Sequence, residues 1–362
     1  MQHRLSRVLE FWDRSKELSI HNNSYRDFVN EFICLLLKND IKNGDLTTNS
    51  LIKGNKNVSA FVISKQDGIL AGLEEFSLIN NDLHLKFLKK DGDKIKKGDI
   101  LIKMNDYGKK ILERERISLN LLQRMSGIAT LTNNLVAKLG NIVKLAATRK
   151  TLWSYIDKKG VSIGGGLTHR LNLNDGIIIK DNHMKILKYD IKKALGFAKN
   201  KSKYIEIEVE NKKQALNAAR AISDIKKSFS RDMRVSEFVG VERERARSRT
   251  HLHARVSESE LSLTHSPSSL DLSASVRADS HAGHRSQKIS FAIMLDKISP
   301  NEVKSIIEEL KNKNLYEDIL FEASGNITTK NLKQYITCGV DIISMGCLTN
   351  SVKSLDMSLK IK

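Results

Sequence analysis

Hydrophobic positions follow one pattern before about residue 140 and another pattern after it. Apolar residues recur at helical spacing over 25–39 and 109–139, and we expect the second of these helices to break at Gly127. Between them, 58–103 contains short Ile-, Leu- and Val-rich runs separated by glycine turns, which predicts a small antiparallel sheet. The first part of the chain is therefore expected to be an α/β domain.

After residue 140, short apolar runs alternate with amphipathic segments. The expected strands are 142–147, 176–180, 204–209, 291–296, 319–323 and 341–345. The expected helices between them are 185–199, 211–222, 300–313 and 328–337. Repeated strand–helix units predict a parallel sheet with right-handed crossovers, either open or closed into a (β/α) barrel.

These patterns divide the chain into parts. Residues 1–24 form an N-terminal extension with an amphipathic helical pattern and no readable role; 25–140 form the first domain, and 141–349 form the barrel domain. The tail, 350–362, is expected to return to the first domain. The barrel is interrupted at 224–288, where Ser, Arg and His dominate and core-forming content is low, so we interpret this segment as a disordered or loosely ordered insertion.

Composition excludes several classes of protein. The formal charge is +19, but the lysines are scattered and few aromatic residues lie among them, so a solvated surface explains the charge better than nucleic-acid binding. Three cysteines without paired spacing argue against a disulfide scaffold or zinc module and favour a reducing cytoplasm. No apolar run has membrane-spanning length, and the first residues lack a secretory signal.

Candidate chemistry concentrates in 145–183, where we single out Arg149, Lys150, His169, Arg170 and Lys180 as donors with little compensating acid. Such a set favours a small substrate with several negative charges. The polar residues expected near strand ends are Arg149, Lys150, Lys180, Glu208, Asp296, Ser324 and Ser344. A barrel would gather them at one mouth. The run Gly164–Gly166 lacks the GK[ST] of a phosphate loop and is interpreted as allowing close backbone approach.

Several motifs in order resemble the quinolinate phosphoribosyltransferase family, also called nicotinate-nucleotide pyrophosphorylase (carboxylating). They are ERISLNLLQRMSGIAT, TRKT, GGGLTHRL, IIIKDNH, IEIEVEN, MLD, EASGNI and ISMGCLT, and the similarity covers about 28–222 and 290–362. The resemblance implies an N-terminal α/β open-face sandwich joined to an incomplete (β/α) barrel. It also implies a homodimer or higher homo-oligomer, with each site completed by the partner's N-terminal domain.

The activity implied by this resemblance is transfer of phosphoribosyl from phosphoribosyl pyrophosphate to quinolinate, with magnesium and with decarboxylation to nicotinate mononucleotide, in NAD biosynthesis. The residues implied to bind the substrates are Arg116 (from the other subunit), Thr148, Arg149, His169, Arg170, Lys180, Ser324, Gly325, Asn326, Ser344, Met345 and Gly346. Lys150, Glu208 and Asp296 would be catalytic. The two acids would bind the ribose hydroxyls directly or through Mg²⁺ and stabilise positive charge at the sugar carbon, while backbone N–H groups at 324–326 and 345–346 would bind the 5′-phosphate.

Five positions depart from the family pattern: Ala147, Ser162, Thr168, Lys297 and Asn326. With the insertion, they motivate a catalytically weakened or silent homologue that acts as a binding or assembly protein. A related transferase for another aromatic acid is a further alternative.

Overall fold

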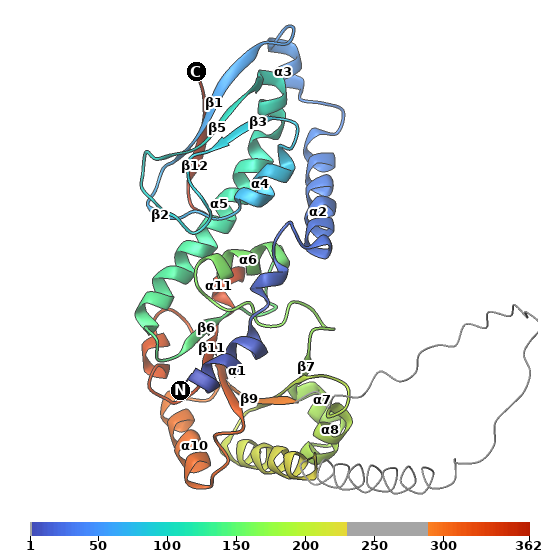
Figure 1. The fold of residues 1–362 in the computed structure, drawn as a ribbon, viewed down its shortest axis with the longest axis vertical. Helices are drawn as coiled ribbons and strands as arrows, with labels where there is room; N and C mark the ends of the chain where they lie inside the picture. Colours follow the sequence, from blue (N-terminus) through green and yellow to red (C-terminus); the bar gives the residue numbers. More distant parts are fainter. Residues whose placement is uncertain (1, 230–288) are drawn as a thin grey trace, which may run out of the picture.

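The computed structural model describes residues 2–229 and 289–362 (Figure 1), so most of the expected insertion lies outside the described residues. The helix that follows β8 continues over 212–229. The expected insertion boundary at 224 is therefore wrong, since 224–229 are helical. No helix in the described part of the chain is both long and apolar enough to cross a bilayer.

The N-terminal domain is an antiparallel sheet with helices against it. Its strands β1 (Asn57–Ser64), β3 (His84–Phe87), β5 (Ile100–Tyr107) and β12 (Met357–Ile361) lie in the order β12-β1-β5-β3. The short pair β2 (Gly68–Ile69) and β4 (Lys94–Ile95) lies beside it. The helices are α2 (Asn23–Ile41), α3 (Leu46–Leu51), α4 (Leu73–Ile79) and α5 (Gly108–Leu139). The sequence prediction missed α4, which lies inside the segment expected to be strands. The end of the chain lies here because β12 pairs with β1.

Helix α5 is continuous, so the break predicted at Gly127 is wrong. A Cβ at Gly127 would lie 2.2 Å from the carbonyl oxygen of Lys353. The glycine is needed because the backbone leading to β12 crosses the helix at this point. It marks a close contact between distant segments, and α5 runs on from the sandwich to the second domain (Figure 1).

The second domain contains an open parallel sheet. Its strands are β6 (Lys144–Ala146), β7 (Ile177–Ile179), β8 (Tyr204–Val209), β9 (Ser290–Asp296), β10 (Leu320–Ser324) and β11 (Ile342–Ser344), which confirms all six predicted strands. Their order is β6-β11-β10-β9-β8-β7, and within the described residues the edge strands β6 and β7 do not pair with each other. This is the expected incomplete barrel.

Two of the predicted helices in this domain differ from the structure. The segment 185–199 forms α7 (Asp181–Ile186) and α8 (Ile191–Ala198), separated by Lys188 and Tyr189 with positive φ. The segment 328–337 forms only the 3-10 turn η2 (Leu332–Tyr335). Side chains there bond to nearby backbone, including Asn331 Oδ1 to Thr328 N at 2.7 Å, and such bonds compete with helix formation. The remaining helices are α6 (Tyr155–Ile163), α10 (Pro300–Asn312) and α11 (Cys347–Asn350).

Alternation along the strands gives the sheet an apolar outer face and a partly polar inner face. Odd-numbered positions of β8 to β11, such as Ile207 and Phe321, join the large core beneath the outer helices. Even-numbered positions point inward and change character along each strand. Tyr204, Ala292, Leu320 and Ile342 form an apolar layer near the strand starts. Glu206 and Glu322 come two residues later along their strands and belong to the next inward-facing layer. At or near the strand ends, the inward-facing residues are Glu208, Asp296, Ser324 and Ser344.

The N-terminal segment covers the lowest inner layer. Helix α1 (Gln2–Trp12) places Val8, Phe11 and Trp12 against that layer, and the short turn η1 (Ser15–Glu17) follows. Arg4 pairs with Asp341 at 2.7 Å, just before β11 begins. The segment that the sequence left as an extension is therefore packed against the barrel (Figure 1).

Candidate active site

The polar residues at the strand ends converge, as expected for a barrel mouth. Lys180 Nζ lies 3.1 Å from Glu208 Oε2, and Lys297 Nζ lies 3.1 Å from Asp296 Oδ2. Burial, together with the neighbouring Asp296, raises the pKa of Glu208 even though Lys180 opposes the shift. The mouth thus holds two carboxylates with a lysine beside each.

The loop after β10 folds against Asp296. Gly325 has φ +79°, and a Cβ on it would lie 2.5 Å from Asp296 Oδ1 and 2.7 Å from Lys297 N. Only glycine fits at this position. Asn326 keeps the left-handed conformation with φ +55°, which asparagine tolerates better than most residues, so the departure at 326 is accommodated.

Segment 148–150 lies beside Gly346. A Cβ at Gly346 would lie 3.3 Å from Lys150 Cδ and 3.7 Å from Thr148 Oγ1. The expectation that the Met345 N–H binds phosphate is wrong in this geometry, because that N–H donates to Ala146 O at 3.1 Å. Ser344 remains close to the loop after β10, with its Oγ 3.0 Å from Ser324 Oγ.

Arg149 and Arg170 lie close enough for each charge to affect the other. Burial and then Arg149 lower the pKa of Arg170, whose Nη1 donates to Gly176 O at 2.8 Å while its buried Nε has no partner among the described residues. An anion bound beside two like charges would relieve their repulsion, which Asp175 and Glu206 already offset in part at Arg170. This arrangement supports a dicarboxylate site.

His169 lies deeper than the other expected substrate contacts. Its Nδ1 accepts a hydrogen bond from the Arg170 N–H at 2.8 Å, so Nε2 carries the ring proton and donates it to Glu322 Oε2 at 3.0 Å. Both ring nitrogens are therefore used within the protein. His169 is thus linked to Arg170 through the Arg170 backbone N–H.

Glu206 and Glu322 are buried carboxyls that the sequence analysis did not single out. Neither Glu206 oxygen meets a donor among the described residues, whereas Glu322 accepts from His169 and Ser344. Burial and the nearby Glu322 raise the pKa of Glu206 well above its usual range. The raised pKa favours the protonated form of Glu206, which can donate a hydrogen bond to Glu322, whose own pKa is lowered beside His169.

The group His169, Glu206 and Glu322 has the composition of a metal site. A metal on Nε2 would require the proton to move to Nδ1, which already accepts the Arg170 N–H. The donor set does not fit an ion.

The alternation of residues along the strands carried a signal for these acids, because Glu206 and Glu322 lie two residues before Glu208 and Ser324 on the same strand faces.

Two further predicted features concern α5 and α6. Arg116 lies on α5 with its side chain 62% exposed, 3.7 Å from Glu115, and is not among the residues gathered at the mouth of this single chain. The glycines at 164–166 do allow close packing: a Cβ at Gly164 would lie 2.5 Å from Ala129 O. Ala147 is buried in the core and Ser162, on α6, is partly buried.

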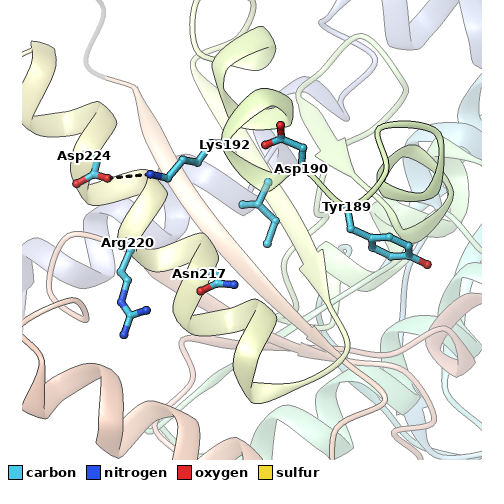
Figure 2. Close-up of a pocket in the computed structure, with 7 residues that line it drawn as sticks. Tyr189, Asp190, Lys192, Asn217, Arg220 and Asp224 are labelled. Carbon is cyan, nitrogen blue, oxygen red and sulfur yellow. Dashed lines mark ion pairs between the residues drawn. The ribbon is translucent and has the colours of Figure 1, made fainter.

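A separate hollow lies on the outer layer between α8 and the helix over 212–229 (Figure 2). Its lining residues are Tyr189, Asp190, Ile191, Lys192, Asn217, Arg220 and Asp224. Two bases and two acids leave it without net charge, and Lys192 points toward Asp224. It therefore lacks the excess of cations that a polyanionic substrate requires.

Comparison with known proteins agrees with this geometry. The family described as "Quinolinate phosphoribosyl transferase, C-terminal domain" matches 128–228 and 280–360, and its N-terminal domain counterpart matches 45–126. The chain belongs to the quinolinate phosphoribosyltransferase family. The segment left between the two C-terminal matches falls within the expected insertion.

Individual members of the quinolinate phosphoribosyltransferase family match over most of their length. A probable nicotinate-nucleotide pyrophosphorylase (carboxylating) of Methanocaldococcus jannaschii is 30% identical, covering 93% of this chain and 98% of that one. The protein of the same description from Bacillus subtilis is 31% identical over 89% of each chain. The solved nicotinate-nucleotide pyrophosphorylase of Francisella tularensis is 25% identical with a TM-score of 0.67, covering 93% of this chain and 96% of that one.

Proposed function

We propose that this protein transfers phosphoribosyl from phosphoribosyl pyrophosphate to quinolinate and releases pyrophosphate and carbon dioxide, giving nicotinate mononucleotide for NAD biosynthesis. The observation that carries the proposal is the meeting of Arg149, Arg170 and Lys180 with Glu208 and Asp296 around one barrel mouth in a chain of this family. Cations suit the dicarboxylate, and acids suit an electron-poor sugar.

Quinolinate binding would rest on the two arginines. A guanidinium group forms paired hydrogen bonds with a carboxylate, which suits the two carboxylates of quinolinate. Lys180 would add charge from the end of β7. Arg116 would reach a neighbouring subunit's mouth in a homodimer or larger homo-oligomer, which its exposed position on α5 permits.

The sugar and phosphates would lie between the acids and the loop after β10. Glu208 and Asp296 would hold the ribose hydroxyls and stabilise positive charge at the sugar carbon as pyrophosphate leaves. The 5′-phosphate would lie at Ser324, Gly325, Asn326, Ser344 and Gly346, without the Met345 N–H. Lys150 would lie between the carboxylate and the pyrophosphate.

Magnesium fits the acid pair. Glu208 Oε1 and Asp296 Oδ1 accept no hydrogen bond from the described residues, and Mg²⁺ is usually held by one or two carboxylates together with substrate phosphates. Bound there, the ion would offset phosphate charge.

The chemistry follows from the charges. The ring nitrogen of quinolinate forms a bond to the sugar carbon as the bond to pyrophosphate breaks. The ring then carries a positive charge, so the neighbouring carboxylate leaves as carbon dioxide and its electron pair remains on the ring. A proton from solvent completes nicotinate mononucleotide. The three free cysteines favour a reducing compartment, and we place the activity in the cytoplasm.

The direct test is a reaction with purified protein. We expect nicotinate mononucleotide from quinolinate only when phosphoribosyl pyrophosphate and magnesium are present, and we expect Arg170→Ala to abolish it. A folded protein that binds neither substrate by calorimetry would instead favour the silent homologue. Turnover of nicotinate without carbon dioxide release would favour a related transferase.

A further inference from the structure

We propose that Arg14, in the N-terminal segment after α1, is a positioning residue for the loop that carries His169 and Arg170. The proposal rests on the proposed function for its kinetic consequences. Its structural consequence, a fixed loop conformation, can be measured without any activity.

The loop over 167–176 crosses the open side of the barrel. Leu167 forms an isolated parallel bridge with Ala146 at the end of β6, and β7 begins at Ile177. Because the edge strands do not pair in the described structure, this loop is what spans the opening. Its shape therefore decides where His169 and Arg170 lie relative to the mouth.

The loop has a conformation that needs support. His169 has φ +56°, a region that non-glycine residues adopt at a cost and that persists only where the surroundings hold it. Its backbone N–H donates to Trp12 O at 2.7 Å, and Trp12 is fully buried against the inner face. The N-terminal segment thus holds the strained residue directly.

Arg14 fixes the same loop at two other points. Its backbone N–H donates to Thr168 Oγ1 at 2.7 Å, and its Nε pairs with Asp175 Oδ1 at 2.7 Å. Asp175 Oδ2 in turn accepts the Leu171 N–H at 2.8 Å. Arg14 therefore clamps the loop on both sides of His169 and Arg170.

The arginine itself is rigid. It is 8% exposed, its guanidinium lies 4.6 Å from the centre of the Tyr204 ring, and its Nη1 donates to Glu10 O at 3.0 Å. A partly buried ion pair whose guanidinium is held by stacking and backbone bonds keeps one geometry. Thr168, a departure from the family pattern, supplies the hydroxyl that Arg14 N–H uses.

The test compares Arg14→Ala with Arg7→Ala. Arg7 is the matched control because it lies on α1 but donates to Glu317 O and Asp318 O, away from the loop. We expect Arg14→Ala to raise the KM for quinolinate about tenfold or more, because small misplacements of binding groups are costly, while the KM for phosphoribosyl pyrophosphate changes less than about twofold. Arg14→Lys, which retains a charge for Asp175, should recover part of the loss.

Amide hydrogen exchange of peptides covering 167–176 supplies the second readout. Exchange should quicken in Arg14→Ala and stay at the wild-type rate in Arg7→Ala. If Arg14→Ala does not fold, Asp175→Ala removes the same pair from the loop side and should give the same pattern. Unchanged exchange, or equal rises in both KM values, overturns the proposal. If wild-type protein turns over no quinolinate, the proposed function fails, and the exchange comparison still decides the role of Arg14.

Discussion

Replacing the buried inner-face carboxyl of Glu206 by an amide should have a very different effect from making the same replacement at Glu322. Glu206→Gln and Glu322→Gln make the same chemical change in one hydrogen-bonded pair. The raised pKa of Glu206 favours its neutral form, and glutamine reproduces the shape of that form, its lack of charge and its ability to donate to Glu322. Glu322 is the acceptor for donors on three sides, from His169, Ser344 and Glu206, so its amide NH₂ would face a donor.

The expected change in the free energy of unfolding follows from the number of hydrogen-bond donors that each variant leaves without a partner. Below pH 4.5, where the unfolded chain also holds the Glu206 proton, Glu206→Gln should change the free energy of unfolding by less than about 1 kcal/mol, because no donor loses its partner. Glu322→Gln leaves at least one buried donor unsatisfied and removes charge from the remaining bonds, which costs about 3 kcal/mol. For a domain of this size, that loss corresponds to a fall in Tm of about 6–12 °C.

The assay is thermal and urea unfolding of both variants at pH 7, repeated across pH. The pKa of Glu206 is raised from its usual 4.5, so above that pH the folded wild type holds a proton that the unfolded chain has lost. Wild-type stability should therefore fall relative to Glu206→Gln by about 1.4 kcal/mol per pH unit until the folded pKa is passed. Equal losses in the two variants at pH 7, or a pH-independent difference for Glu206→Gln, would refute the assignment of the protons.

Three other substitutions test the packing of the chain, with Gly196→Ala as the control for Gly127→Ala. Burial lowers the pKa of Lys158 to about 7 while its Nζ donates to the carbonyls of Thr168 and Arg170. Between pH 7 and about 10 the unfolded chain holds a proton on Lys158 that the folded chain has lost. Wild type should therefore gain stability relative to Lys158→Met as pH rises, by about 1.4 kcal/mol per pH unit. Urea titrations at several pH values check the sign, and a stability difference that does not change with pH would show that Lys158 titrates normally. Gly127→Ala should destabilise by about 1–3 kcal/mol because its Cβ meets the backbone before β12. Gly196→Ala, in open space on α8, should stabilise by about 0.5–1 kcal/mol; equal Tm shifts for the two alanines would contradict the close contact.

The alternation of apolar runs and polar turns along the sequence was sufficient to predict where the strands of the barrel lie. Buried runs such as 204–209 are bounded by polar turns, and the structure has them within one or two residues of the expected bounds. Boundaries that depend on tertiary contact were missed. Gly127 looked like a helix break because a sequence cannot show that another backbone crosses there, and the pattern over 328–337 could not reveal that side chains of Thr328 and Asn331 bind the turn.

The mouth was predictable for a different reason: parallel strands end at one side, so residues after each strand must meet. The layer beneath it was not recognised. Glu206 and Glu322 look like solvent-facing acids until the sheet curves and buries its inner face. The role of the N-terminal segment depends on contacts over more than 150 positions of sequence, such as Arg14 with Asp175, which no local pattern encodes.

The central claim is that cations and acids at one barrel mouth act on a dicarboxylate and an activated ribose. Release of labelled carbon dioxide from carboxyl-labelled quinolinate tests it most directly. We predict release that requires phosphoribosyl pyrophosphate and equals the nicotinate mononucleotide formed. Folded protein that releases no label at saturating concentrations of both substrates and magnesium would contradict the account.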